Sequence, residues 1–525
     1  MSKNSKLNIL ILLFLGTTVF YPLVTMLFQV DWSTFSTLIN SSAFKESMHN
    51  SLLSTSIATV ISILVAYLLA YALNRTDIKH REVLKVLITV PMLIPSISHG
   101  LGLINLFGTN GIITRFIHLN IIGPVGVVLG SLLYSAPVAF LMFNDGFNYI
   151  DNNMYHTAKV LGFNKWQTFK KVTLCYMLKP ILSAAFAVFT MIFTDYGVPL
   201  VVGGKYITLP VFLYKEVIGL LDFSKGTLIG LFLLIPALIS FLFDLLVEDY
   251  SDGEYMNSGI EVDNKIINIL LKIFVYFILI FIAVLFGSFI YFAFVNNAVL
   301  DKTFTLKHFD YVISNGIGKY IFNSLFIAVA VSVFGTIIAY TAAYFTARKK
   351  GKLSHIIHIL TITSLAIPGI VLGLSYTICF RKSFIYNTYI ILIIVNIVHF
   401  IASPYLMAYN ALQKVNQNYE TVAKTCNISL IKIVLDVIVP CTKKTIREML
   451  AYFFVNSMIT ISAITFLFNT RTMPLSLLIN NYESSMMLGE AAIVSMIILM
   501  FNIVVKSAVY LIGRKEYRKN YVDSK

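Results

Sequence analysis

Long apolar stretches, separated by short polar segments, dominate the chain from one end to the other. An α-helix needs roughly 20 residues to cross about 30 Å of hydrocarbon, and twelve stretches reach that length. We predict membrane-spanning helices over residues 7–30, 50–74, 83–107, 122–145, 181–203, 227–247, 266–295, 323–347, 355–379, 386–410, 447–469 and 487–512. The pattern therefore predicts an all-α, polytopic membrane protein. We expect the first span to stay as a helix and not to be removed as a signal peptide, because its apolar run is too long.

The composition supports a lipid environment and disfavours an enzyme. Hydrophobic residues make up 58% of the 525 positions, charged residues only 12%, and the mean hydropathy is +0.81. A soluble protein of this size could not bury so much apolar surface. The sequence has no phosphate-binding Gly-rich loop, zinc-binding His-Glu-x-x-His helix or Gly-x-Ser-x-Gly elbow. Its four cysteines are scattered, so we expect no catalytic residues, cofactor, metal site or disulfide.

The second half of the chain repeats the first. Asn50-Ser51 recurs as Asn323-Ser324, Arg75 as Arg348, and Ile94-Pro95 as Ile367-Pro368, each 273 positions later. Six helices per half is an even number, so we expect two parallel six-helix repeats related by an axis along the membrane normal. The predicted units are a first half at 1–247, an acidic linker at 248–265 and a second half at 266–525. We expect the repeated Asn-Ser pairs to form hydrogen bonds between helices.

Two polar loops, at 151–175 and 416–440, match without a gap at a spacing of 265 positions. Ala158 matches Ala423, Gly162 matches Asn427, and Cys175 matches Pro440. The loops resemble the motif of the permease subunits of type I ABC importers: E-A-A, three residues, Gly, nine residues, then I-x-L-P. In that family the loop forms a coupling helix that docks into an ATPase. The resemblance implies coupling roles for His156, Thr157, Ala158, Gly162, Glu420, Thr421, Val422, Ala423, Asn427 and Pro440.

Residue types in the loops suit a helix–turn–helix lever. Gly162 is expected to form the turn because glycine adopts positive φ freely, and Asn427 is a suitable replacement there. The small side chains of Thr157, Ala158 and Ala423 are expected to allow close approach to a groove on the ATPase. The loops depart from the family motif at its glutamate. Tyr155 or His156 stands there in the first loop, and Glu420 lies one position early in the second, so the ATPase contacts are expected to differ.

The distribution of cations predicts the orientation. Lysine and arginine gather in the loops that would be cytoplasmic if the N-terminus is cytoplasmic. This arrangement places both signature loops and both termini inside, in a multi-pass protein of a bacterial cytoplasmic membrane. The net charge of +15 then reflects topology and contact with anionic lipid. No nucleic-acid partner is expected.

A few polar residues within the predicted spans are candidates for the translocation path: Asp195, His99, Asn105 and His399. Ionisable groups at membrane depth are costly and often functional. The alternatives are structural. Asp195 could be an interfacial acid that pairs with Lys205, and the two histidines could be hydrogen-bonded packing residues.

The resemblance implies a permease subunit without chemistry of its own, working with an ABC ATPase dimer and an extracytoplasmic solute-binding protein. The runs 91–100 and 106–111 look most similar to permeases for 2-aminoethylphosphonate. Ferric iron, thiamine and polyamines are alternative cargoes. The alternative class is an ion-coupled secondary carrier, which is disfavoured because the loop at 74–82 lacks the glycines of the facilitator superfamily.

Overall fold

The structure is a computed structural model that describes residues 3–109, 111–117, 120–148, 150, 152–246, 264–297, 301–349, 351–416 and 418–523. Within these residues every regular element is a helix, except for the two strands of one small antiparallel hairpin. In the described part of the chain, eight helices are long and apolar enough to cross a membrane, or eleven if each of three bent pairs counts as one span, against the twelve spans predicted. The predicted all-α, polytopic fold is confirmed. The acidic linker predicted at 248–265 lies almost entirely outside the described residues.

The elements of the first half include four short π- or 3₁₀-helical pieces beside the α-helices. They are α1 (Lys3–Leu15), η1 (Gly16–Phe20), α2 (Tyr21–Leu27), α3 (Trp32–Asn40), α4 (Ser42–Arg75), α5 (Arg81–Thr89), η2 (Val90–Leu93), α6 (Ser96–Phe107), α7 (Thr114–Ile117) and α8 (Pro124–Asn148). After these come α9 (Asn152–Val160), α10 (Lys165–Thr168), η3 (Phe169–Thr173), α11 (Leu174–Phe193), α12 (Gly197–Val202), α13 (Leu209–Tyr214), η4 (Lys215–Gly219) and α14 (Phe223–Leu246).

The second half follows the same order, with a β-hairpin added after its first helix. Its elements are α15 (Lys265–Phe294), β1 (Val295–Asn297), β2 (Asp301–Phe304), α16 (Lys307–Ser314), α17 (Ile317–Arg348), α18 (Lys352–Thr363), η5 (Ser364–Ala366), α19 (Gly369–Phe380), α20 (Tyr389–Phe400) and α21 (Ala402–Lys414). The chain continues through α22 (Asn418–Thr425), α23 (Leu430–Ile433), η6 (Val434–Ile438), α24 (Val439–Cys441), α25 (Lys443–Ile459), α26 (Leu475–Ser484) and α27 (Leu488–Asp523).

The third span of each half is broken at its Ile-Pro pair. The two segments meet at 97° in the first half and at 111° in the second. Ile94 and Ile367 are extended, as a residue before proline prefers, and α6 and α19 begin directly after Pro95 and Pro368. The Ile-Pro pairs that match between the two halves of the sequence therefore form the same kind of break in both.

The fifth span of each half is shorter than its apolar run. We predicted spans at 181–203 and 447–469, but α11 ends at Phe193 and α25 at Ile459. In both halves the next residues bend and pack inside the protein, with Tyr196 and Ala463 fully buried. An apolar run alone does not distinguish a spanning helix from a buried turn, which explains the misplaced ends.

The repeated Asn-Ser pairs tie helices together as predicted. The Ser51 hydroxyl accepts from the Leu209 amide at 2.6 Å, and the Ser324 hydroxyl accepts from the Leu475 amide at 2.7 Å. These amides start α13 and α26, where backbone N–H groups lack partners within the helix. The Asn323 side chain also donates to the carbonyls of Arg471 and Met473, both at 2.9 Å.

Each half is completed by helices of the other. The first span (α1, η1 and α2) packs on α18, α19 and α20, while α15 packs on α4, α5 and α6. Hydrogen bonds cross the same interface: the Tyr376 hydroxyl donates to the Thr18 carbonyl at 2.6 Å, and Asn502 donates to the Leu93 carbonyl at 2.8 Å. The halves are therefore interlocked, and neither has a complete core alone.

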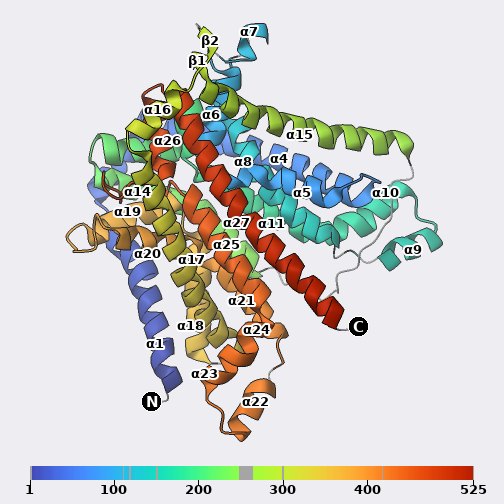
Figure 1. Ribbon diagram of the computed structural model, residues 1–525. Coiled ribbons are helices and arrows are strands. Elements are labelled where there is room, and N and C mark those ends of the chain that lie inside the picture. The colour runs from blue at the N-terminus through green and yellow to red at the C-terminus, as the bar shows by residue number, and fades with distance from the viewer. Residues whose placement is uncertain are drawn as a thin grey trace.

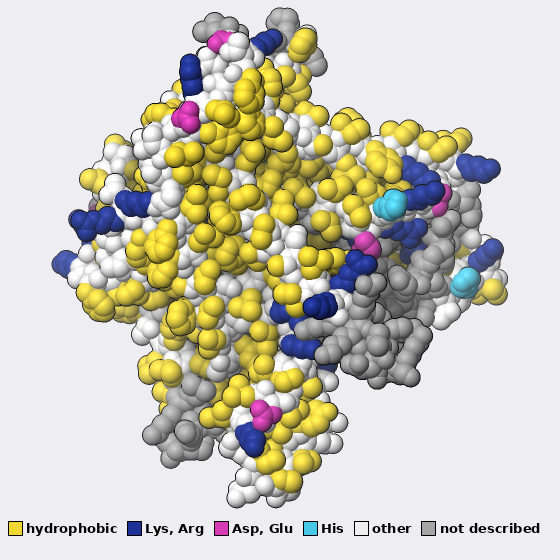
Figure 2. Space-filling view, in the orientation of Figure 1, with side chains coloured by type: hydrophobic (Ala, Val, Ile, Leu, Met, Phe, Trp, Pro, Cys, Tyr) yellow, Lys and Arg dark blue, Asp and Glu magenta, His cyan; other side chains and the backbone are white. Residues whose placement is uncertain are grey.

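The outer surface of the helices is apolar. Figure 2 shows hydrophobic side chains covering the broad face formed by the region of α15, α17 and α27, with lysine and arginine mostly toward the margins. Phe277 and Ile280 on α15 are each 63% exposed. Contiguous apolar surface of this extent is untenable in water and is what a lipid-facing surface requires.

Candidate functional site

The two signature loops fold alike, residue for residue. Each consists of a short helix, a left-handed residue and a second helix that becomes π-helical. The left-handed residues are Gly162, with φ +73°, and Asn427, with φ +53°. The following pairs, α10 with α23 and η3 with η6, begin and end 265 positions apart. The repeat inferred from the sequence is thus repeated in backbone conformation, and the predicted turn at Gly162 and Asn427 is confirmed.

Matching hydrogen bonds close the two turns. The Phe163 amide donates to the Ala158 carbonyl at 2.9 Å, and the Ile428 amide donates to the Ala423 carbonyl at 2.8 Å. This is the bond that ends a helix at a left-handed residue. Asn164 then caps α10 and Ser429 caps α23 through their side chains, so both helices after the turn start with a satisfied amide.

Side chains in the loops divide into a buried and an exposed set. Ala158 and Ala423 are each only 2% exposed, so their methyl groups face this chain. Their small size fits each loop closely against its own half, and the expected close approach of the loops to a groove on an ATPase stays a prediction. His156, Thr157, Thr421, Val422 and Pro440 are exposed.

Several of the exposed side chains in the two loops are large and apolar. Val160 is 87% exposed, Leu161 65% and Trp166 69%; in the second loop Val422 is 56% exposed and Ile431 59%. Figure 1 shows α9 and α10 at one tip of the molecule and α22 and α23 at another, with the hairpin β1–β2 at the opposite end. Apolar side chains at two projecting tips are typical of protein–protein contact surfaces.

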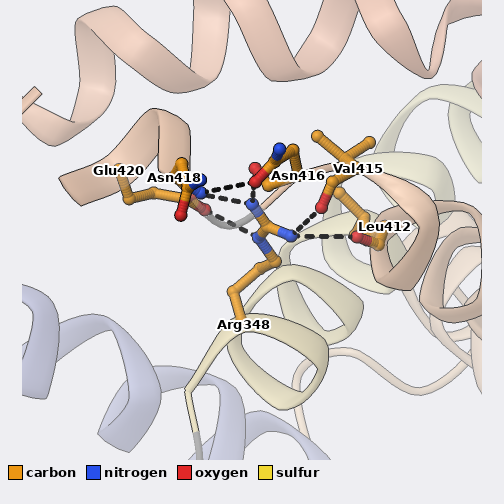
Figure 3. Close-up of polar contacts among 6 residues, drawn as sticks. All are labelled: Arg348, Leu412, Val415, Asn416, Asn418 and Glu420. Atoms are coloured by element: carbon orange, nitrogen blue, oxygen red, sulfur yellow. Dashed lines mark hydrogen bonds and ion pairs between the residues drawn. The ribbon is translucent and has the colours of Figure 1, made fainter. Parts of the chain in front are cut away.

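Arg348, the last residue of α17, joins three elements at the base of the second loop (Figure 3). Its Nε and Nη2 donate to the two carboxylate oxygens of Glu420 at 2.7 and 2.6 Å. Its remaining N–H groups reach the carbonyls of Leu412, Val415 and Asn416 at the end of α21. All five guanidinium donors therefore have acceptors, in a site where the arginine side chain is 2% exposed.

Arg75 occupies the same place in the first half but has a different partner. It ends α4, and its Nη2 donates to the Tyr155 hydroxyl at 2.9 Å. The guanidinium lies 4.6 Å from the centre of the Tyr155 ring, a cation–π distance. Tyr155 corresponds to Glu420 at the 265-residue spacing. Among the described residues Nη1 of Arg75 is buried without an acceptor. Arg75 therefore lacks the two-point contact that Arg348 makes with the carboxylate of Glu420.

Asp195 is partly buried and is held by contacts within the first half. It accepts from the Ser96 hydroxyl at 2.7 Å and from the Val198 amide at 3.0 Å. These contacts join the start of α6 to the first turn of α12. Among the described residues, no ion pair joins Asp195 to Lys205, so the geometry is that of an internal helix cap.

The other path candidates are buried polar groups with incomplete hydrogen bonding. His99 is fully buried beside Ser96, with Nδ1 3.3 Å from the Ser96 carbonyl. Among the described residues, His99 Nε2, both side-chain atoms of Asn105 and His399 Nδ1 have no partner. His399 belongs to the second half, close to Gly369. The structure therefore brings Asp195 and His99 together around Ser96 and leaves His399 in the other half.

Sequence comparison shows the family. The profile described as "Binding-protein-dependent transport system inner membrane component" matches residues 62–252 and again residues 335–516. The chain belongs to this family. The two matches cover both signature loops, so the inner-membrane component is present in duplicate within one chain.

Among relatives of this inner-membrane component are two ferric transport permeases. The ferric transport system permease protein FbpB of Actinobacillus pleuropneumoniae is 25% identical over 76% of this chain and 62% of its own length. The putative ferric transport system permease protein FbpB 1 of Haemophilus influenzae is also 25% identical, over 76% of this chain and 67% of its own. The chain thus matches about two thirds of their length. The molybdate/tungstate permease WtpB of Pyrococcus abyssi is 28% identical over 30% of this chain.

Two features of this inner-membrane component were not assigned from the sequence. Arg75 and Arg348 were matched as repeat positions, but their partners were not predicted because those lie 80 and 72 positions away. Tyr196 donates or accepts a 2.9 Å hydrogen bond with Thr465 across the two halves. A tyrosine just beyond the end of α11 and a threonine just beyond the end of α25 are the signal that could have found the second contact.

Proposed function

We propose that the chain is the permease subunit of an ATP-driven importer, with both halves of the translocation path in one polypeptide. The observation that carries this proposal is the duplicated loop. Two loops with the same backbone conformation, each with a left-handed residue at its centre, lie at two tips of the molecule. An ATPase dimer offers two equivalent docking sites, and two equivalent loops in one chain suit such a partner. The family match supports this class over an ion-coupled secondary carrier.

The geometry suggests how force would pass. Each exposed helix, α9 or α22, is joined through a tight turn to a second helix that continues into a span (α11) or ends against one (α25). A closed turn with capped helices transmits displacement better than a flexible loop would. When ATP draws the two ATPase subunits together, the loops move and the halves rock, while an extracytoplasmic binding protein supplies cargo at the opposite end.

The proposed function includes a membrane orientation and a division of the chain into two halves and a linker. Both loops and both termini lie in the cytoplasm of a bacterial cell, the first half is 1–247, the linker 248–265 and the second half 266–525. The path runs between the halves, past Asp195, His99, Asn105 and His399. The unpartnered atoms of His99, Asn105 and His399 are groups that water in an open path would solvate, which supports this placement.

Ferric iron is the cargo that the relatives favour, because two ferric permeases match three quarters of the chain. The alternative, 2-aminoethylphosphonate, came from the runs 91–100 and 106–111. Much of the first run forms the broken span at Pro95, and the same break recurs at Pro368. A feature that both halves share reflects the repeat architecture more than the chemistry of a cargo, so it weakens that alternative.

The test is co-purification followed by reconstitution. The detergent-solubilised chain is captured with the ATPase and the binding protein encoded beside it, and ATP hydrolysis is measured in nanodiscs. We expect an ATPase dimer to co-purify, and ferric-loaded binding protein to stimulate hydrolysis. Stimulation by 2-aminoethylphosphonate alone would change the cargo, and transport by the lone chain on an ion gradient would contradict the proposed class.

A further inference from the structure

The strongest unassigned feature is the difference between the two arginine contacts beneath the coupling loops. Arg75 and Arg348 are the last residues of helices of similar length, α4 and α17, and stand at matched repeat positions. Each contacts the same position of the following loop helix, which is Tyr155 in α9 and Glu420 in α22. The contacts Arg75–Tyr155 and Arg348–Glu420 therefore occupy matched positions in the two halves but differ in chemistry.

In the second half the contact is a closed ionic fork. Arginine and carboxylate match in a planar, bidentate geometry that fixes direction as well as distance. Glu420 stands in the first turn of α22, where a carboxylate also favours the helix dipole. The same guanidinium binds carbonyls at the end of α21, where a cation is favourable for the same reason. Arg348 thus holds α17, α21 and α22 in one arrangement.

In the first half the contact is one hydrogen bond and a cation–π contact with a neutral phenol. Tyr155 accepts from Arg75 and its hydroxyl also lies 2.9 Å from the Thr173 hydroxyl in η3. A phenol offers one oxygen and no charge. Both arginine side chains are buried, since Arg75 as a whole residue is 4% exposed and the Arg348 side chain is 2% exposed. The difference therefore lies in the partner and not in solvent screening.

We propose that Arg348 and Glu420 form an internal clamp that positions the second coupling helix. The Glu420 carboxylate then serves this chain and not the ATPase, and the first loop, held by Arg75 and Tyr155, is the more compliant of the two. This inference rests on the proposed function for its meaning in transport. The clamp itself can be tested without any partner protein.

The first experiment is amide hydrogen exchange on the purified full-length chain. We expect peptides covering 418–425 to exchange more slowly than peptides covering 153–160. Glu420→Gln keeps the shape of the side chain but removes its charge, and should speed exchange at 418–425 by about tenfold. Tyr155→Glu should slow exchange at 153–160, because it rebuilds the ionic fork with Arg75. Tyr155→Phe is the matched neutral control, and α17 serves as an internal reference for the fold.

The second experiment adds the ATPase. Because the carboxylate is used internally, Glu420→Gln should retain ATPase capture within about twofold while uptake falls about tenfold or more, which is an uncoupled phenotype. Unchanged exchange at 418–425 in Glu420→Gln overturns the clamp, whether or not ATPase capture is lost. Failure of the wild-type chain to capture any ATPase would instead contradict the proposed function and leave the exchange result standing.

Discussion

At the scale of single residues, the turn position of the coupling loops is the most constrained. A Cβ at Gly162 would meet no atom of the described residues within 4 Å, so the barrier to a side chain that the structure shows there is the positive φ. That conformation costs an ordinary residue about 1–2 kcal/mol, and a β-branched residue more. We therefore expect Gly162→Val to lower ATP-driven uptake about tenfold or more while membrane insertion stays normal. Uptake in proteoliposomes, normalised to inserted protein, measures this.

The repeat supplies the matched control for that substitution. Asn427 already holds the equivalent position at φ +53°, so Gly162→Asn should retain uptake within about twofold. Asn427→Val should be milder than Gly162→Val, because the second loop already accommodates a side chain. Equal loss with Asn and Val at position 162 would show that contact with a partner, and not backbone conformation, requires glycine there.

At the scale of elements, Asp195 joins α6 to α12 by capping the first turn of α12. Asp195→Ala would leave the Val198 amide and the Ser96 hydroxyl without this acceptor, a cost of about 1–3 kcal/mol for a buried group. Asp195→Asn keeps an acceptor oxygen and should be nearly neutral. Thermal unfolding of the detergent-solubilised chain should show a lower midpoint for the alanine variant only. If the asparagine variant keeps its stability but loses uptake, the charge of Asp195 acts on the cargo, and the capping role alone does not explain why this residue is needed.

At the scale of the whole molecule, the interlocked halves must move against each other if the proposed cycle is right. Ser98 on α6 and Ser495 on α27 lie 2.9 Å apart across the halves, and Ser62 and Ser135 lie 2.9 Å apart within the first half. With the four native cysteines replaced, Ser98→Cys with Ser495→Cys should block uptake on oxidation and recover on reduction. Both pairs are short enough for a disulfide to be tried.

The within-half pair, Ser62→Cys with Ser135→Cys, is the control for that disulfide, since α4 and α8 belong to one moving unit. It should form a disulfide without blocking uptake. Full activity with the cross-half disulfide in place would mean that α6 and α27 move as one body. In that case α27 would belong to the same moving unit as the first half.

An ion pair between the halves predicts a pH dependence of stability. Asp77 after α4 accepts from Asn268 and pairs with Lys272 on α15, at 2.7 and 2.6 Å. These hydrogen bonds lower the pKa of Asp77 to about 2. A depressed carboxyl pKa stabilises the folded state above the unfolded value of about 3.9, and this contribution is lost as the pH falls through the folded value.

Asp77→Asn should accordingly lower the unfolding midpoint by a constant small amount between pH 8 and about pH 5. The difference from the unmodified chain should shrink below about pH 4, and high salt should reduce it because Asp77 is exposed. Unfolding followed by fluorescence across this pH range provides the measurement. A difference that grows on acidification would contradict the assigned ion pair.

The amino-acid sequence by itself determined the membrane environment, the repeat, the Ile-Pro breaks and the left-handed turns at Gly162 and Asn427. Each of these depends on local properties: apolar length, proline sterics or the freedom of a single backbone position. Only the tertiary structure decided that α1 and α15 complete the opposite halves, that α11 and α25 end before their apolar runs do, and that Arg348 binds a carboxylate where Arg75 binds a phenol. Those features depend on contacts between residues far apart in the chain, and the free energy of a buried ion pair or a helix interface has no signature in the local pattern of either partner.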